Sequence, residues 1–145
     1  MNDIGKPERA TQDRVIALFR DGLEYRYLGD WTDRAGNSNI EQTVLSHYLH
    51  KAGYDDLQAS RAIYLLRVDA DNHDRGLYEN NKAVYKRLRY GVPVKTEAGK
   101  VTETVHLINR KDPAKNDFAI ADEVTLKDVA EVERSFLIIK AQSEY

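Results

Sequence analysis

The sequence predicts an α+β fold in which helices pack on a small, mostly antiparallel sheet. In the first two-thirds of the chain, apolar residues recur at intervals of three and four, which is typical of amphipathic helices. From Val92 onward the period changes to two, which is typical of strands. At 145 residues the chain has the length of one compact domain with its own core.

Composition narrows the class of protein. Hydrophobic residues make up 41% and charged residues 32%, which is ordinary for a soluble protein. No apolar run approaches the roughly 20 residues that span a bilayer, so we expect no contact with membranes. The N-terminus lacks the apolar core of a signal peptide, and without cysteine there are no disulfides or thiolate metal sites. These features predict a cytoplasmic protein. A net charge of −2 argues against a strongly basic nucleic-acid binder, although a local basic stripe can still contact phosphates.

The first elements are predicted from proline, glycine and apolar spacing. A helix from about Pro7 to Arg20 begins at a proline and ends as Gly22 arrives. A short strand around residues 25–28 and a long loop follow it. We expect Trp31, the single tryptophan, to anchor this region rather than to stack on bases.

Three further helices are predicted between residues 39 and 90. Ser38 and Glu41 fit a capping box for a helix from Asn39 to Lys51. Asp55 or Asp56 caps a third helix that runs to about Arg67 and buries one apolar face: Ala59, Ala62, Ile63 and Leu66. After a polar link at residues 69–74, which we expect to be solvated, a fourth helix spans Arg75 to Tyr90. Its apolar spacing predicts these inward positions: Leu77, Tyr78, Asn81, Val84, Tyr85 and Leu88.

The remaining residues are predicted to form strands and one ambiguous tail. Residues 92–96 and 101–107 flank a Glu97 to Lys100 turn and fit a β-hairpin, and residues 118–126 fit another strand. In the tail, Phe136 to Ile139 fits a buried strand, whereas Glu131 to Arg134 fits the start of a terminal helix. We favour the helix. A tail that paired as a strand could instead cover an open sheet edge.

Several short motifs together carry a family likeness. The main ones are Tyr78-Glu79-Asn80-Asn81-Lys82, Val105-His106-Leu107-Ile108-Asn109 and Asn116-Asp117-Phe118, and residues 8–12 and 28–41 support them. The chain resembles the N-terminal region of the restriction (R, or HsdR) subunit of type I restriction-modification enzymes. The likeness covers roughly Pro7 to Lys127. It therefore divides the chain into a partial R-subunit N-terminal domain, residues 1–127, and a divergent tail, residues 128–145.

This resemblance implies a function and also a departure from it. The family's complex translocates DNA with ATP and cuts it with Mg²⁺ in defence against foreign DNA, and its R subunit begins with a restriction-endonuclease-like domain. In the family, a Pro-Asp dipeptide and then a Glu-x-Lys triplet follow this region, bind the metal and cut DNA. Here residues 128–136 read Asp-Val-Ala-Glu-Val-Glu-Arg-Ser-Phe. We therefore expect a chain truncated before the catalytic motif that does not cut DNA by itself. It also lacks a glycine-rich phosphate loop, so it does not encode the ATP-driven motor.

Two acidic residues match family positions that could belong to an incomplete catalytic site. Glu8 lies where the family has a first-helix glutamate, and Asp117 lies in the Asn-Asp-Phe motif. Structural roles are the alternatives. Glu8 can interact favourably with the helix dipole from the first turn of the helix, and Asp117 can accept hydrogen bonds from nearby backbone amides in its loop. One acid cannot hold Mg²⁺, so we predict no metal site in the chain. His47 and His50 have a spacing that is mostly incidental without further ligands.

A basic helix face is the predicted contact with DNA. Lys82, Lys86 and Arg89 recur on one side of the fourth helix, and Arg87 lies close by. They can contact phosphates, or they can form a solvated face that complements the helix dipole. Two functions follow: an N-terminal fragment of an R subunit, or a non-enzymatic module that docks on DNA or on the modification and specificity subunits of the complex.

Overall fold

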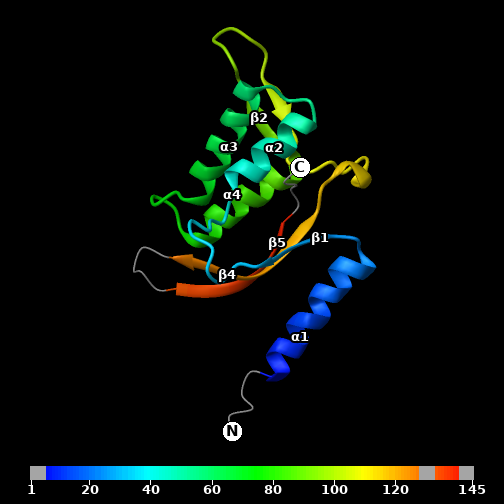
Figure 1. Cartoon of the computed structure of the whole chain (residues 1–145). Coiled ribbons are helices and arrows are strands. Elements are labelled where there is room, and N and C mark those ends of the chain that lie inside the picture. Colours follow the sequence, from blue (N-terminus) through cyan, green and yellow to red (C-terminus); the bar gives the residue numbers. More distant parts are fainter. Residues whose placement is uncertain (1–5, 128–132, 141–145) are drawn as a thin grey trace. The chain divides into compact units, whose positions relative to one another are not determined.

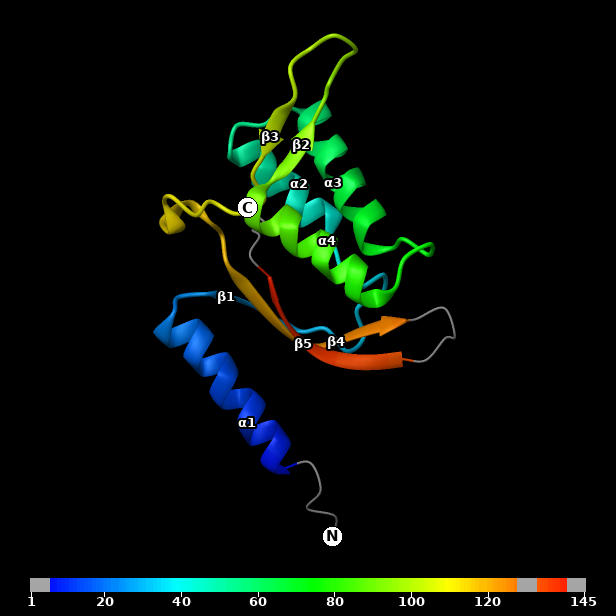
Figure 2. The same cartoon turned by 180° about the vertical axis from the view of Figure 1, so that it is seen from behind.

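The computed structural model describes residues 6–127 and 133–140, which form two compact units (Figures 1 and 2). The first, here called the sheet unit, comprises residues up to 39 and from 117 to 140 within these ranges. The second, the helical unit, comprises residues 40–116. The helical unit is thus inserted, in sequence, into the sheet unit.

The sheet unit consists of one helix and a three-stranded sheet. Helix α1 (Lys6–Ala17) continues into a π-helical turn (Leu18–Gly22) and leads to strand β1 (Arg26–Asp30). Strand β4 (Ala119–Lys127) lies in the middle of this sheet, between β1 and β5 (Glu133–Lys140). It pairs with β1 in parallel and with β5 in antiparallel orientation. Parallel neighbours need a crossover connection, and here the whole helical unit supplies it.

Bulges interrupt both pairings of β4. The registers shift between Tyr27 and Asp30 and between Ala121 and Val124, where Gly29 and Glu123 adopt positive φ of 97° and 51°. Trp31 is buried against Leu28, Ala121 and Val124, and its Nε1 donates to the Leu28 carbonyl at 3.3 Å. The predicted anchoring role of the tryptophan is confirmed.

The helical unit packs three helices around a small hairpin. Its elements are α2 (Gln42–Lys51), α3 (Asp56–Ala70), α4 (Leu77–Tyr90), β2 (Val92–Val94), β3 (Glu103–Val105) and a 3-10 turn (Pro113–Lys115). Strands β2 and β3 pair antiparallel, as predicted for the hairpin. The core joins α2 and α3 to these strands: Leu45, Tyr48, Leu49, Ala59, Ala62, Ile63, Leu66, Val92, Val94, Val105 and Leu107.

Asp55 is the N-cap residue of α3, which confirms the predicted acidic cap, and it forms a capping box with Gln58. The Asp55 side chain accepts from the Gln58 backbone N at 2.8 Å, and the Gln58 side chain accepts from the Asp55 N at 3.0 Å. The capping box predicted at Ser38 and Glu41 is wrong. Helix α2 begins later, at Gln42, and its N-cap residue Glu41 makes no side-chain cap.

The α+β class is confirmed, whereas two details of the predicted arrangement are wrong. Residues 133–140 of the tail form strand β5 and not a helix, because the apolar run Phe136 to Ile139 pairs with β4. Residues 128–132 and 141–145 of the same tail lie outside the described residues. The strand predicted around residues 25–28 is confirmed as β1. The sheet is nevertheless not built only from residues after Val92, because β1 joins it by parallel pairing with β4.

The predicted inward face of α4 is the third correction. Leu77, Tyr78, Asn81 and Tyr85 are exposed, and the buried residue of α4 is Asn80. Val84 and Leu88 are half-buried against the core, as predicted. Apolar spacing alone did not identify the buried face of α4, because tyrosines also recur at helical spacing on its exposed face.

Gly91, which follows α4, is a position where the backbone requires glycine. Its φ is +86°, and a Cβ there would lie 2.6 Å from Thr104 Cγ2 and 2.9 Å from the Val105 carbonyl oxygen. The helix can therefore pass directly into β2 only because no side chain is present.

We expect Gly91→Ala to lower the free energy of unfolding by about 3 kcal/mol, from backbone strain and the clash together. Gly99→Ala is the matched control. Gly99 has a φ of +87° with nothing within 4 Å of the added Cβ, so it should lose only about 1 kcal/mol. Urea unfolding measures both values, and equal losses would contradict the clash.

Candidate functional site

A buried carboxylate joins the elements of the sheet unit. Asp122, on β4, is fully buried. The Tyr27 hydroxyl, on β1, donates to its Oδ1 at 2.6 Å, and Arg9 Nη1, on α1, donates to its Oδ2 at 3.0 Å. Arg9 also forms ion pairs with two other carboxylates: its Nε lies 3.1 Å from Asp13 Oδ1, and its Nη1 lies 3.7 Å from Glu123 Oε1. Asp122, Tyr27 and Arg9, here called the Asp122 cluster, therefore connect α1, β1 and β4.

Asp122 raises the pKa of both side chains that donate to it. The hydrogen bond to Asp122, and then burial, raise the pKa of Tyr27 to about 12. The hydrogen bond from Arg9 to Asp122 raises the pKa of the guanidinium. Both oxygens of Asp122 are engaged by these donors. The carboxylate of Asp122 therefore anchors α1 and β1 to β4 through these two hydrogen bonds.

The structure does not bring Glu8 and Asp117 together. Glu8 is exposed in the first turn of α1, next to Arg9. Asp117 precedes β4, and its Oδ1 lies 3.9 Å from Arg26 Nη2. The neighbouring Phe118 ring stacks on Tyr25 at 5.1 Å, and Tyr25 contacts Phe19 beyond the far end of α1. At roughly 1.5 Å per helical residue, Glu8 is about 14 Å from the end of α1 at Ala17.

The described residues do not fit a divalent metal ion. Between residues 6 and 127, and in β5, no group of three or more His, Cys, Asp or Glu side chains could hold one. Magnesium needs several oxygen ligands in near-octahedral geometry, and the buried carboxylate already accepts from Arg9 and Tyr27. No metal-dependent step can be derived from these side chains.

The predicted basic residues of α4 separate into two groups. Lys82, Lys86 and Arg89 are exposed. Arg87 is half-buried, and its Nε donates to Asp69 at 2.6 Å. Asp69 also accepts from Arg75 Nη2 at 3.3 Å. The link that begins at Asp69 was predicted to be solvated, which is wrong for this residue, because it holds both arginines against the end of α3.

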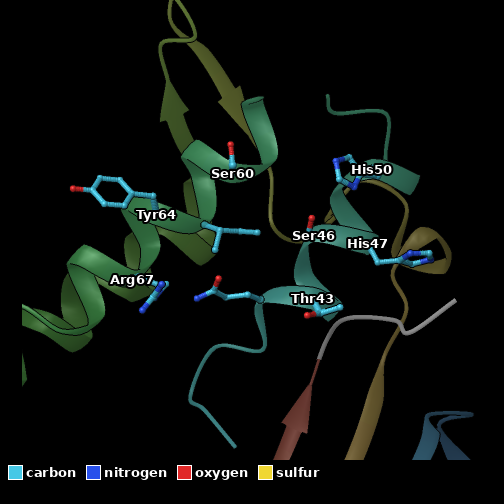
Figure 3. Close-up of a pocket in the computed structure, with 9 residues that line it drawn as sticks. Thr43, Ser46, His47, His50, Ser60, Tyr64 and Arg67 are labelled. Carbon is cyan, nitrogen blue, oxygen red and sulfur yellow. The ribbon is translucent and has the colours of Figure 1, made fainter. Parts of the chain in front are cut away.

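A groove of about 560 Å³ lies between α2 and α3 (Figure 3). Its side chains do not converge: Tyr64 and His47 extend in opposite directions. With the side-chain amide of Gln42 oriented so that its oxygen faces Arg67, this oxygen accepts from Arg67 Nη1 at 2.7 Å. His50 Nε2 lies 2.7 Å from Asp56 Oδ1. Among the described residues, His50 belongs to no group of side chains that could hold a metal ion.

The motif asparagines hold loops. Asn116 Oδ1 accepts from the Tyr48 hydroxyl at 3.0 Å and from the Asn109 backbone N at 2.7 Å. Its Nδ2 donates to the Asn109 carbonyl at 2.7 Å and to the Pro113 carbonyl at 3.2 Å. Asn80, in the earlier motif, donates to the Asn72 carbonyl at 3.0 Å. These motif residues fix backbone turns of the helical unit and do not line a common site.

The Asp122 cluster was not predicted from the sequence. One signal was present in the sequence, because Asp122 interrupts the mainly apolar run from Phe118 to Val124. An acid buried in such a strand needs hydrogen-bond donors as partners. The partners come from α1 and β1, more than ninety residues earlier, and nothing in the sequence indicated which residues they are.

Comparison with known proteins gives one match. The family model described as type I restriction enzyme R protein N terminus matches residues 6–135 of the 145-residue chain. No curated protein and no solved structure matches. None of the helices formed by the described residues is long and apolar enough to cross a membrane.

We expect Tyr27→Phe to lower the free energy of unfolding by about 1.5 kcal/mol at neutral pH, because a buried carboxylate oxygen loses its donor. The folded pKa of Tyr27, about 12, lies above its usual 10.0. Its contribution is therefore complete below pH 10 and is lost as the pH rises through about 12.

Urea unfolding at a series of pH values measures this effect. The difference between the unchanged protein and Tyr27→Phe should shrink at high pH. The control is Tyr64→Phe, which changes an exposed phenol of α3 and should have little effect at neutral pH. A difference for Tyr27→Phe that stays constant up to pH 12 would contradict the assigned role.

Proposed function

The chain belongs to the family of type I restriction enzyme R protein N termini, and on that premise we propose that it supplies scaffold to the DNA-processing region of an R subunit. The single observation that carries this proposal is the family match, which runs through both the sheet unit and the helical unit. The assembly it serves acts in restriction-modification, in defence against foreign DNA.

The chain itself, in this proposal, does not cut DNA. Residues 128–145 contain neither a Pro-Asp dipeptide nor a Glu-x-Lys triplet. Glu8 and Asp117 lie apart, and Asp122 is occupied by its two donors. Mg²⁺ and ATP would serve other parts of the parent enzyme.

A second candidate function is docking through α4. This helix carries four basic residues (Lys82, Lys86, Arg87 and Arg89) and one acidic residue, Glu79, although the whole chain has a net charge of −2. Positive charge is thus concentrated on an exposed helix, which favours contact with phosphates or with an acidic protein surface.

We expect the purified chain to leave supercoiled plasmid intact in Mg²⁺ and to bind a modification-specificity core complex or DNA. A double Lys82→Glu and Lys86→Glu variant should lose about tenfold or more in DNA affinity, and the loss should diminish as salt is raised. Mg²⁺-dependent cleavage would overturn the non-cutting role.

The matched control is the double variant Arg110→Glu and Lys111→Glu. It makes the same change of charge at exposed residues outside α4. An equal loss of affinity in both double variants would show that net charge and not the α4 face decides binding. Failure to bind either DNA or the core complex would sink the docking function.

A further inference from the structure

Helix α4 exposes tyrosines and cations on one face. The exposed fractions of Tyr78, Tyr85 and Tyr90 are 73%, 54% and 64%. Counted from Tyr78, Lys82, Tyr85 and Arg89 follow at four, seven and eleven residues, which places them on one side of a helix. We call Tyr78, Lys82, Tyr85, Lys86, Arg89 and Tyr90 the tyrosine face. The core contacts of α4 come from Val84 and Leu88 instead.

The rings and the cations of the tyrosine face lie beside one another, and one pair is hydrogen-bonded. Lys82 Nζ lies 6.0 Å from the centroid of the Tyr78 ring. Arg89 Nη1 donates to the Tyr85 hydroxyl at 2.8 Å, and the Arg89 guanidinium carbon lies 5.4 Å from the Tyr90 ring. Large apolar rings that remain exposed between cations are costly to keep in water and are typical of binding surfaces.

A positively charged cavity adjoins the C-terminal end of this face. It has a volume of about 480 Å³, and two residues of the tyrosine face, Lys86 and Tyr90, line it. Arg75 and Arg87 also line it, with Asp69 as the acidic residue among its lining. Three cations thus surround one carboxylate, which leaves the lining of the cavity with a net positive charge. The cavity suits an anion.

We propose that the tyrosine face binds single-stranded DNA, with bases stacked on Tyr78, Tyr85 and Tyr90 and a backbone phosphate beside Lys86 at the cavity. Stacking needs base faces that a duplex keeps covered, whereas the cations neutralise phosphates in either form. This inference rests on the proposed function for the presence of DNA and adds the form of DNA that α4 recognises.

Fluorescence anisotropy of the full chain with three labelled ligands tests the inference. The ligands are a mixed-sequence single strand of about 15 nucleotides, an abasic strand of the same length and a duplex. We expect the mixed strand to bind about tenfold tighter than either of the others, since only it offers free base faces. An RNA strand of the same sequence is the fourth arm, and a preference for RNA would overturn the assignment to DNA.

Variants separate stacking from charge. The double change Tyr78→Ala and Tyr85→Ala should weaken binding of the mixed strand about tenfold or more and leave the abasic strand unaffected. Tyr78→Phe with Tyr85→Phe should retain binding, because the ring faces remain. Tyr64→Ala, which removes a 60% exposed tyrosine on α3, is the control for loss of a surface ring. Circular dichroism checks that each variant folds.

The outcomes distinguish this inference from the proposed function. Equal binding of duplex, abasic and mixed strands, with no effect of the tyrosine changes, would overturn the inference and leave docking on DNA phosphates intact. Binding to the core complex without binding to any nucleic acid would also overturn it, while the docking function stands through protein contacts. Binding to none of these partners would overturn both.

Discussion

The sheet unit depends on one buried negative charge. Asp122 has no exposed surface, and a carboxylate in that position is costly unless donors replace the water that it loses. Tyr27 and Arg9 supply those donors from β1 and α1. Removing either partner leaves an uncompensated acceptor, so the requirement of Asp122 specifies the positions of α1 and β1 against β4. A purely apolar residue at this site would satisfy the packing without selecting partners.

The order of elements explains how the two units are related in sequence. Strand β1 pairs in parallel with β4, and 88 residues separate the end of β1 at Asp30 from the start of β4 at Ala119. The helical unit fills this crossover with a core of its own, formed by α2, α3 and the hairpin. The entropic cost of closing a loop grows only slowly with the length of the loop, so a long insertion with its own core is tolerated. The Asn116-Asp117-Phe118 motif marks the return, since Asn116 fastens the last turn of the helical unit and Phe118 precedes β4.

The residues that carry the family likeness and the residues that could contact a ligand are largely different sets. Asn80, Asn109 and Asn116 fix loops through backbone hydrogen bonds, which makes their amide groups difficult to replace. The cations and rings of the tyrosine face are exposed, and the contacts of α4 with the core come from Val84 and Leu88 instead. Of the motif residues, Tyr78 and Lys82 belong to both sets.

The sequence alone was enough to predict the α+β class, most helix and strand positions, an acidic cap for α3 and the anchoring role of Trp31. These follow from local rules: periodicity, caps and the position of glycine and proline. The family could also be identified from the sequence, because its short motifs can be recognised before the fold is known. The tertiary structure decided the rest: the strand at residues 133–140, the outward face of α4, the pairing of Arg87 with Asp69 and the Asp122 cluster. Each of these depends on partners far along the chain. A residue's own neighbours in sequence set its backbone preference, but only the packed fold decides which side chains lose water and which donors replace it.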